Sequence, residues 1–161
     1  MSNTTIAAST TVNAETAAAT AQFFNQMVQD LTALSVNGKQ AHWHVRGPNF
    51  IGIHELLDDV VDHARAWSDE AAERVIALGL PVDGRISAVA AGTKAPELSA
   101  GFQQAPAVIA EVVAQIDATL AGVHAAIDEL GDIDPVSQDI AIAIAQGLDK
   151  DRWFLAAHIA A

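Results

Sequence analysis

Residues 39–63, KQAHWHVRGPNFIGIHELLDDVVDH, contain the end of one helix, a turn and the start of the next. The turn is Arg46-Gly47-Pro48-Asn49, because glycine and proline interrupt helices. Before the turn, apolar residues recur at spacings of three and four, which predicts a helix from about residue 14 to 45 whose buried stripe is Phe23, Met27, Leu31 and Leu34. After the turn, a similar pattern predicts a second helix from about residue 50 to 78, with apolar rows at Ile53, Leu56, Leu57, Val60, Val61, Val75 and Ile76.

The rest of the chain completes an all-α pattern. Alanine, the best helix former, occurs 34 times. A connection over residues 80–105 is too long for an ordinary loop, so we expect a short helix inside it, around residues 86–91. Further helices are expected at about 107–130 and 135–159, although the alternation of Ile140, Ile142 and Ile144 would also suit a strand. Four long helices with one long middle connection predict a ferritin-like four-helix bundle over residues 14–161, preceded by a flexible arm at residues 1–13.

Composition excludes several classes of protein. The chain has no cysteine, which removes disulfides, zinc ribbons and thiol nucleophiles. Its formal charge of −12 argues against general binding to nucleic-acid phosphates and favours cations as partners. No stretch approaches 18 uninterrupted apolar residues, and residues 1–20 have neither a basic segment nor a continuous apolar segment, so we expect a cytoplasmic protein without a membrane span.

Histidines and carboxylates gather on the second predicted helix. Four of the six histidines lie between residues 42 and 63. At about 100° per residue, His54, Asp58, Asp69 and Glu73 fall within about 100° of one another, on a single helix face. A mixture of imidazole and carboxylate ligands suits iron, manganese or zinc, and the absence of sulfur disfavours copper(I).

These four residues form two pairs that cannot meet within one chain. Asp58 and Asp69 are 11 residues apart, about 16 Å along a helix axis, whereas metal–ligand bonds are about 2 Å long. Either other helices complete two separate half-sites, or a second subunit supplies the missing half. A two-fold axis near residues 63–64 would place His54 and Asp58 of one chain opposite Asp69 and Glu73 of its copy. His42 can fold back across the turn and add a nitrogen ligand.

Simpler interpretations remain open for the same residues. An acidic helix face is often only a solvated surface, and a single histidine is more often structural than a ligand. Asp59, Asp62 and Glu70 are interpreted as surface groups or as supports for ligands. His63, on the opposite side of the helix, and His124 and His158 are interpreted as structural, and His44 is ambiguous.

The segment from Lys39 to Phe50, followed by His54-Glu55-Leu56-Leu57-Asp58 and Asp69-Glu70-Ala71-Ala72-Glu73-Arg74, closely resembles the Dps family of mini-ferritins. Leu148-Asp149-Lys150 and Trp153-Phe154 also resemble the last helix of that family. The resemblance implies a hollow shell of twelve subunits with ferroxidase centres at two-fold interfaces. It also implies that His42, His54 and Asp58 come from one subunit and Asp69 and Glu73 from its partner.

The resemblance implies a function as well. Iron(II) would be oxidised, mainly by hydrogen peroxide, and iron(III) stored as a mineral, which would protect the cell from oxidative damage. Trp43 matches a tryptophan beside the centre that is thought to quench oxidising equivalents. An iron site inside one bundle, as in ordinary ferritins, is disfavoured because no histidine has a glutamate three positions before it.

Two other functions differ from iron oxidation in class. A DNA-protecting nucleoid protein is disfavoured because no Lys or Arg precedes Lys39 and the chain ends AAHIAA, so we predict weak or no DNA binding. A metal-dependent hydrolase stays possible, because a bound metal ion lowers the pKa of its water. A serine hydrolase is disfavoured, since no G-x-S-x-G motif is present.

Overall fold

The computed structural model describes residues 12–160, and nearly all of its regular structure is helical. The helices are α1 (Ala14–His44), α2 (Phe50–Ala77), α3 (Ile86–Gly92), α4 (Ala105–Leu130) and α5 (Pro135–Ala157). Two strands of two residues each, β1 (Val45–Arg46) and β2 (Gln103–Gln104), complete the structure. The ferritin-like all-α prediction is confirmed, including the short helix in the long connection.

The predicted arm at residues 1–13 falls largely outside the described part of the chain, which begins at Val12. Asn13 does lie within it and caps α1, because its side-chain oxygen accepts a hydrogen bond from the backbone N–H of Thr16 at 2.9 Å. α1 begins directly after this cap, at Ala14.

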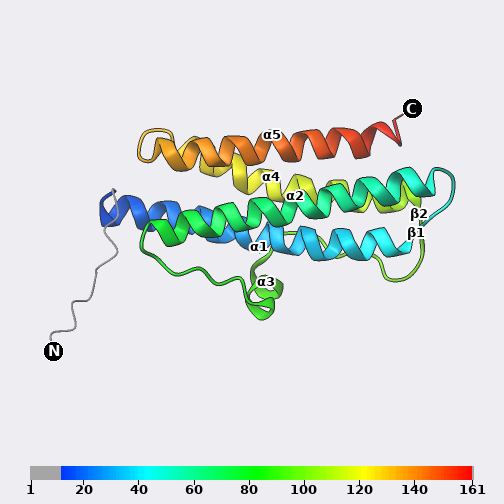
Figure 1. Ribbon diagram of the computed structural model, residues 1–161, viewed down its shortest axis with the longest axis horizontal. Helices are drawn as coiled ribbons and strands as arrows, with labels where there is room; N and C mark the ends of the chain where they lie inside the picture. The colour runs from blue at the N-terminus through cyan, green and yellow to red at the C-terminus, as the bar shows by residue number, and fades with distance from the viewer. Residues whose placement is uncertain (1–11, 161) are drawn as a thin grey trace.

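The four long helices lie side by side along one axis (Figure 1). α1 and α2 run in opposite directions, as do α4 and α5, and the connection between α2 and α4 travels back along the bundle. α3 lies on this connection, outside α1. At the far end β1 and β2 pair in parallel, with Val45 opposite Gln103 and Arg46 opposite Gln104, so the connection is tied to the turn between α1 and α2.

That turn depends on two residues with positive φ. Gly47 has φ 108° and Asn49 has φ 61°, a region that glycine and asparagine adopt more readily than other residues. The turn reverses the chain within a few residues. As a result, the last turn of α1 lies beside the first turns of α2.

The core consists mainly of buried apolar side chains. Two residues that the sequence placed on buried stripes, Phe23 and Ile76, are not buried as predicted. Phe24 is fully buried and Phe23 only partly, because spacings of three, four and three from Phe24 keep Met27, Leu31 and Leu34 on one face. Ile76 is 57% exposed, since it lies one residue, about 100°, beyond the buried Val75.

Among the described residues, α4 alone is long and apolar enough to meet the length and composition criteria for a membrane span. The core helix of a bundle meets the same criteria. α4 packs against both α1 and α5 and buries Val112, Ile116 and Val123 completely.

Candidate metal centre

His42 and His54 lie face to face beside the turn that joins α1 to α2. The rings are stacked, with centroids 3.5 Å apart and planes inclined by 22°. Each Nδ1 lies within hydrogen-bond distance of the other residue's backbone carbonyl oxygen, at 2.7 Å from His42 and 2.9 Å from His54. A carbonyl can only accept, so both rings carry their proton on Nδ1 in these two bonds.

This reciprocal arrangement determines which nitrogen atoms can bind a metal. With Nδ1 donating, the Nε2 atom of each ring keeps a free lone pair, and a hydrogen bond at the other nitrogen is the usual support of a metal-binding histidine. The His42 ring is also held by its surroundings, because the residue is only 6% exposed. The structure thus places two oriented imidazoles side by side.

Asp58 is the carboxylate nearest to this pair. Its Oδ1 lies 3.2 Å from Nδ1 of His42 and also forms an ion pair with Nζ of Lys39. The hydrogen bond from Lys39 lowers the pKa of Asp58 and outweighs the opposing effect of burial. Asp58 is therefore ionised and engaged on the Nδ1 side of His42.

Lys39 is a contact of the proposed ligand Asp58 that the sequence pattern did not predict. It lies three residues before His42, so the two side chains share one face of α1. The spacing of three residues between Lys39 and His42 is the sequence feature from which its position near the site could have been predicted.

Asp69 and Glu73 lie farther along α2 and are exposed. Within residues 12–160 neither forms an ion pair with another side chain, and no group of three or more His, Asp or Glu residues is gathered closely enough to hold a metal ion. The structure of one chain therefore brings His42, His54 and Asp58 together and leaves Asp69 and Glu73 apart from them.

Aromatic side chains border the histidine pair. Trp43 follows His42 and is 61% exposed. The ring of Phe50 lies 5.0 Å from that of His54. Trp43 shares its face of α1 with Val36, seven residues earlier and 63% exposed.

The other histidines lie apart from this pair. His44 contacts the backbone oxygen of Gln40 through Nδ1 at 2.9 Å, and its ring lies 5.4 Å from that of Phe102. His63 contacts Asp151 on α5. His124 and His158, interpreted from sequence as structural, are both exposed.

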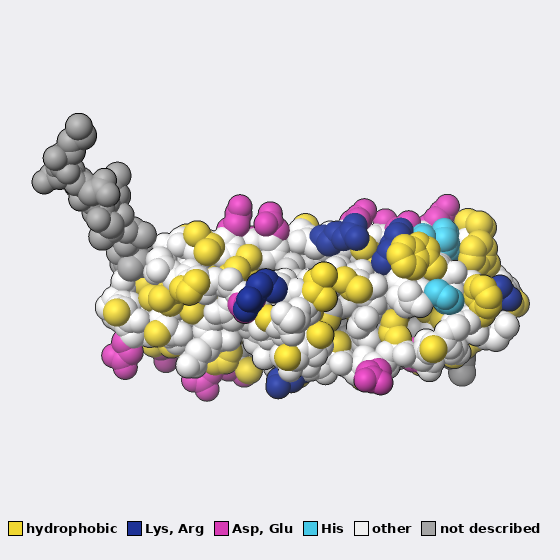
Figure 2. Space-filling view, turned by 90° about the horizontal axis from the view of Figure 1, so that it is seen from below, with side chains coloured by type: hydrophobic (Ala, Val, Ile, Leu, Met, Phe, Trp, Pro, Cys, Tyr) yellow, Lys and Arg dark blue, Asp and Glu magenta, His cyan; other side chains and the backbone are white. Residues whose placement is uncertain are grey.

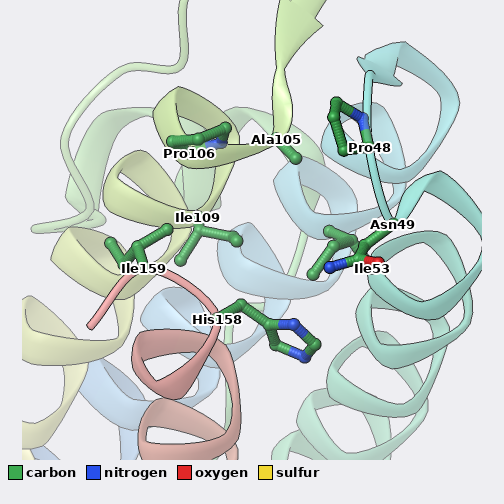
Figure 3. Close-up of a pocket in the computed structure, with 8 residues that line it drawn as sticks. All are labelled: Pro48, Asn49, Ile53, Ala105, Pro106, Ile109, His158 and Ile159. Carbon is green, nitrogen blue, oxygen red and sulfur yellow. The ribbon is translucent and has the colours of Figure 1, made fainter. Parts of the chain in front are cut away.

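A pocket of about 160 Å³ lies at the same end of the bundle (Figure 3). Apolar side chains dominate its wall, and the ring of His158 points across it toward Ile53. Its lining is Pro48, Asn49, Ile53, Ala105, Pro106, Ile109, His158 and Ile159. Because no carboxylate is among these residues, the pocket is not part of the metal-ligand set.

The surface is divided in charge and polarity. On the face drawn in Figure 2, histidine side chains gather near one end beside hydrophobic and basic ones, and acidic side chains lie mainly along the two long edges. Exposed apolar side chains thus lie at the same end of this face as the exposed histidines.

Comparison with known proteins gives the family. A model described as the ferritin-like domain matches residues 21–161. The DNA protection during starvation protein of Mycolicibacterium smegmatis is 33% identical over 139 residues, covering 86% of this chain and 76% of the relative. The chain belongs to the Dps family.

Solved structures of Dps proteins agree closely with this fold. Dps from Microbacterium arborescens in the high iron form is 54% identical, with a TM-score of 0.91, over 95% of this chain and 100% of that one. Mycobacterium smegmatis Dps is 31% identical, with a TM-score of 0.89, over 94% and 93%. The fine tangled pili major subunit of Haemophilus ducreyi is also similar, with 32% identity over 86% of this chain and 74% of the relative. Membership of the Dps family supports a role in iron storage and protection.

Proposed function

We propose that this protein oxidises iron(II) at sites shared by two subunits and stores the resulting iron(III) inside a homo-oligomeric cage of twelve chains. His42, His54 and Asp58 of one subunit, with Asp69 and Glu73 of the partner subunit, are the proposed ligands. Hydrogen peroxide is the proposed oxidant. The observation that carries the proposal is the stacked pair His42 and His54, with both Nδ1 atoms bonded to backbone and both Nε2 atoms free.

The ligand types suit both oxidation states of iron. Imidazole nitrogen binds iron(II) well, and carboxylate oxygen favours the harder iron(III). In the overall reaction, two iron(II) ions and two protons reduce one hydrogen peroxide to two water molecules, so each iron gives up one electron. Because both oxygen atoms leave as water, this stoichiometry yields no hydroxyl radical.

A second observation supports the proposal: one chain alone does not bring the five proposed ligands together. Asp69 and Glu73 are exposed on the same side of α2 as His54 and Asp58, but they lie about 16 Å and about 22 Å from Asp58 along the helix. A copy of α2 placed antiparallel about residues 63–64 would bring each acidic pair to the other chain's histidines. Trp43, beside this centre and exposed, would lie where it can donate an electron to a stray oxidant.

The test is complementation between two inactive variants. His54→Ala and Glu73→Ala should each abolish rapid iron(III) formation after iron(II) and peroxide are mixed without oxygen, followed by ultraviolet absorbance. When the two chains assemble at random in equal amounts, half of the dimers are mixed, and one of the two sites in each is intact. We therefore expect about a quarter of the original activity to return.

The matched control is His124→Ala, which removes an exposed histidine from α4. It should leave the rate unchanged. Full activity in both single variants, or no recovery in mixed assemblies that contain both chains, would contradict the shared site.

A further inference from the structure

His63 lies on the side of α2 opposite to the proposed iron site, about 180° around the helix from His54. Its Nδ1 is 3.0 Å and 3.1 Å from the two carboxylate oxygens of Asp151 on α5. The Asp151 side chain is 3% exposed, whereas that of His63 is 48% exposed. A buried carboxylate thus holds one nitrogen of a ring whose other side reaches solvent.

This contact orients the ring. Burial raises the pKa of Asp151, and the hydrogen bond from His63 opposes that rise. With Nδ1 donating to the carboxylate, Nε2 carries the free lone pair and faces away from Asp151. A carboxylate that accepts from one ring nitrogen while the other binds metal is a recurring arrangement in metal sites, where it fixes the tautomer and the ring direction.

A second ligand lies one helical turn earlier. Asp59 is exposed and precedes His63 by four residues, so the two side chains are neighbours on one face of α2. Asp59 is also close enough to Asp151 for its charge to act on that carboxyl group. The same spacing of four brings two histidines to one zinc ion in helical metal motifs.

The surroundings of Asp59 are open to solvent. A shallow hollow of about 450 Å³ lies between the start of α2 and the end of α5, and its wall combines Glu55, Asp59 and His158 with the apolar Leu56, Trp153 and Phe154. Water can therefore reach Asp59 and fill coordination positions that the protein leaves vacant.

We propose that Nε2 of His63 and the carboxylate of Asp59 bind a divalent transition-metal ion such as Zn²⁺ or Fe²⁺, with Asp151 as the positioning residue. Two ligands come from the protein and water supplies the others, in keeping with the lack of any group of three His, Asp or Glu ligands in residues 12–160. The site shares no ligand with the proposed iron centre, so the two sites are tested independently of each other.

A structural ion pair alone would explain the contact between His63 and Asp151 but would give Asp59 no role. The experiment therefore tests whether Asp59 contributes to metal binding. Zn²⁺ binding is measured by equilibrium dialysis and metal analysis on the assembled protein, in a background of His54→Ala with Asp58→Ala that removes the proposed iron ligands. We expect about one Zn²⁺ per chain to remain. Asp59→Asn and Asp151→Asn should each weaken its affinity by about tenfold or more.

Asp62→Asn is the matched control. Asp62 is also an exposed aspartate on α2, but it contacts Arg65 at 3.7 Å and lies about 100° around the helix from His63. Zn²⁺ affinity should not change in this variant. Equal affinity in Asp59→Asn and Asp62→Asn, or no bound Zn²⁺ in the background protein, would overturn the proposal.

A spectroscopic measurement does not require the proposed iron ligands to be replaced. The Trp67 ring lies 5.4 Å from that of His63, so Co²⁺ bound to His63 should quench its fluorescence. With Trp43→Phe and Trp153→Phe, Trp67 is the one remaining tryptophan. Asp59→Asn should shift the quenching to at least about tenfold higher Co²⁺, and quenching that is identical in Asp59→Asn and Asp62→Asn would count against the site.

Discussion

Asp134 is a buried carboxylate that joins three helices through its hydrogen bonds. It accepts from Arg74 at the end of α2 at 3.0 and 3.1 Å, from Thr20 on α1 at 3.2 Å and from Ser137 on α5. Burial by itself would raise the pKa of Asp134, but the hydrogen bonds from Ser137 and Arg74 outweigh it, so the pKa is lowered. The ionised form therefore stabilises the fold.

We expect Asp134→Asn to lower the free energy of unfolding by about 3–5 kcal/mol at neutral pH, because it leaves the charge of Arg74 buried without its partner. Since the folded pKa lies below the unfolded value of about 3.9, the stabilisation is complete above that pH and is lost as pH falls through the folded pKa. Thermal unfolding at several pH values measures the effect. A deficit that stays constant from pH 7 to well below pH 4 would contradict this account.

At the level of single residues, the sequence predicted which residue types meet but not how they meet. The pairing of His42 with His54 followed from the short turn between two helices. The reciprocal bonds to backbone oxygens did not, because they depend on the positive φ at Gly47 and Asn49 and on the exact approach of α1 to α2. The ligand roles of the five proposed residues stay predictions.

At the level of helices, packing between α2 and α5 depends on a glycine. A Cβ atom added at Gly147 would lie 2.0 Å from Cζ2 of Trp67, a distance that forces one of the two helices or the ring to move. Gly122, on α4, has no heavy atom within 4 Å of the same added atom. The chain thus offers two helical glycines that differ in their surroundings.

We expect Gly147→Ala to destabilise the protein by about 1–3 kcal/mol, because overpacking outweighs the gain in helix propensity. Gly122→Ala should instead stabilise it by up to about 1 kcal/mol. Comparing the thermal unfolding of the two variants checks both statements. Equal stabilisation by the two substitutions would show that the Trp67 ring moves aside without any loss of stability.

Helix positions were predicted well because spacing of apolar residues and the breakers around residues 46–49, 79–81 and 131–135 are local signals. The strands Val45–Arg46 and Gln103–Gln104 were missed, since a two-residue pair between segments far apart in the chain leaves no periodicity to detect. The choice between Phe23 and Phe24 was also missed, because it depends on the helices that α1 faces on each side.

At the level of the whole molecule, an apolar strip on α1 is available for a second copy. Val36 is 63% exposed and lies on the same face as Trp43, next to Lys39 and close to the exposed Ile86 of α3. Exposed apolar side chains that lie near one another can mark an interaction site. Lys39, three residues after Val36 on α1, contacts the proposed ligand Asp58 on α2.

We expect Val36→Glu to reduce assembly and iron oxidation together while leaving helix content intact, because it places a charge in the proposed two-fold contact. Size-exclusion chromatography, circular dichroism and the iron(III) absorbance assay measure the three properties. Ala121→Glu, the same charge on an exposed position of α4, should preserve all of them. Loss of assembly with unchanged oxidation would contradict a site shared between chains.

The formal charge of −12 per chain also has a consequence for the proposed cage. Each added chain increases the repulsion from phosphate groups, so we expect plasmid DNA to migrate unretarded on a gel at physiological salt. Retardation at low salt by stoichiometric amounts of the assembled protein would contradict this expectation.

The reciprocal hydrogen bonds of His42 and His54 join residues within a segment of 13 in one chain. They therefore form without a second subunit. A newly made subunit would already present its nitrogen donors, yet it would lack most of the oxygen donors. Pairing of two chains would then complete the ligand set, so a free monomer would lack the carboxylates needed to oxidise iron.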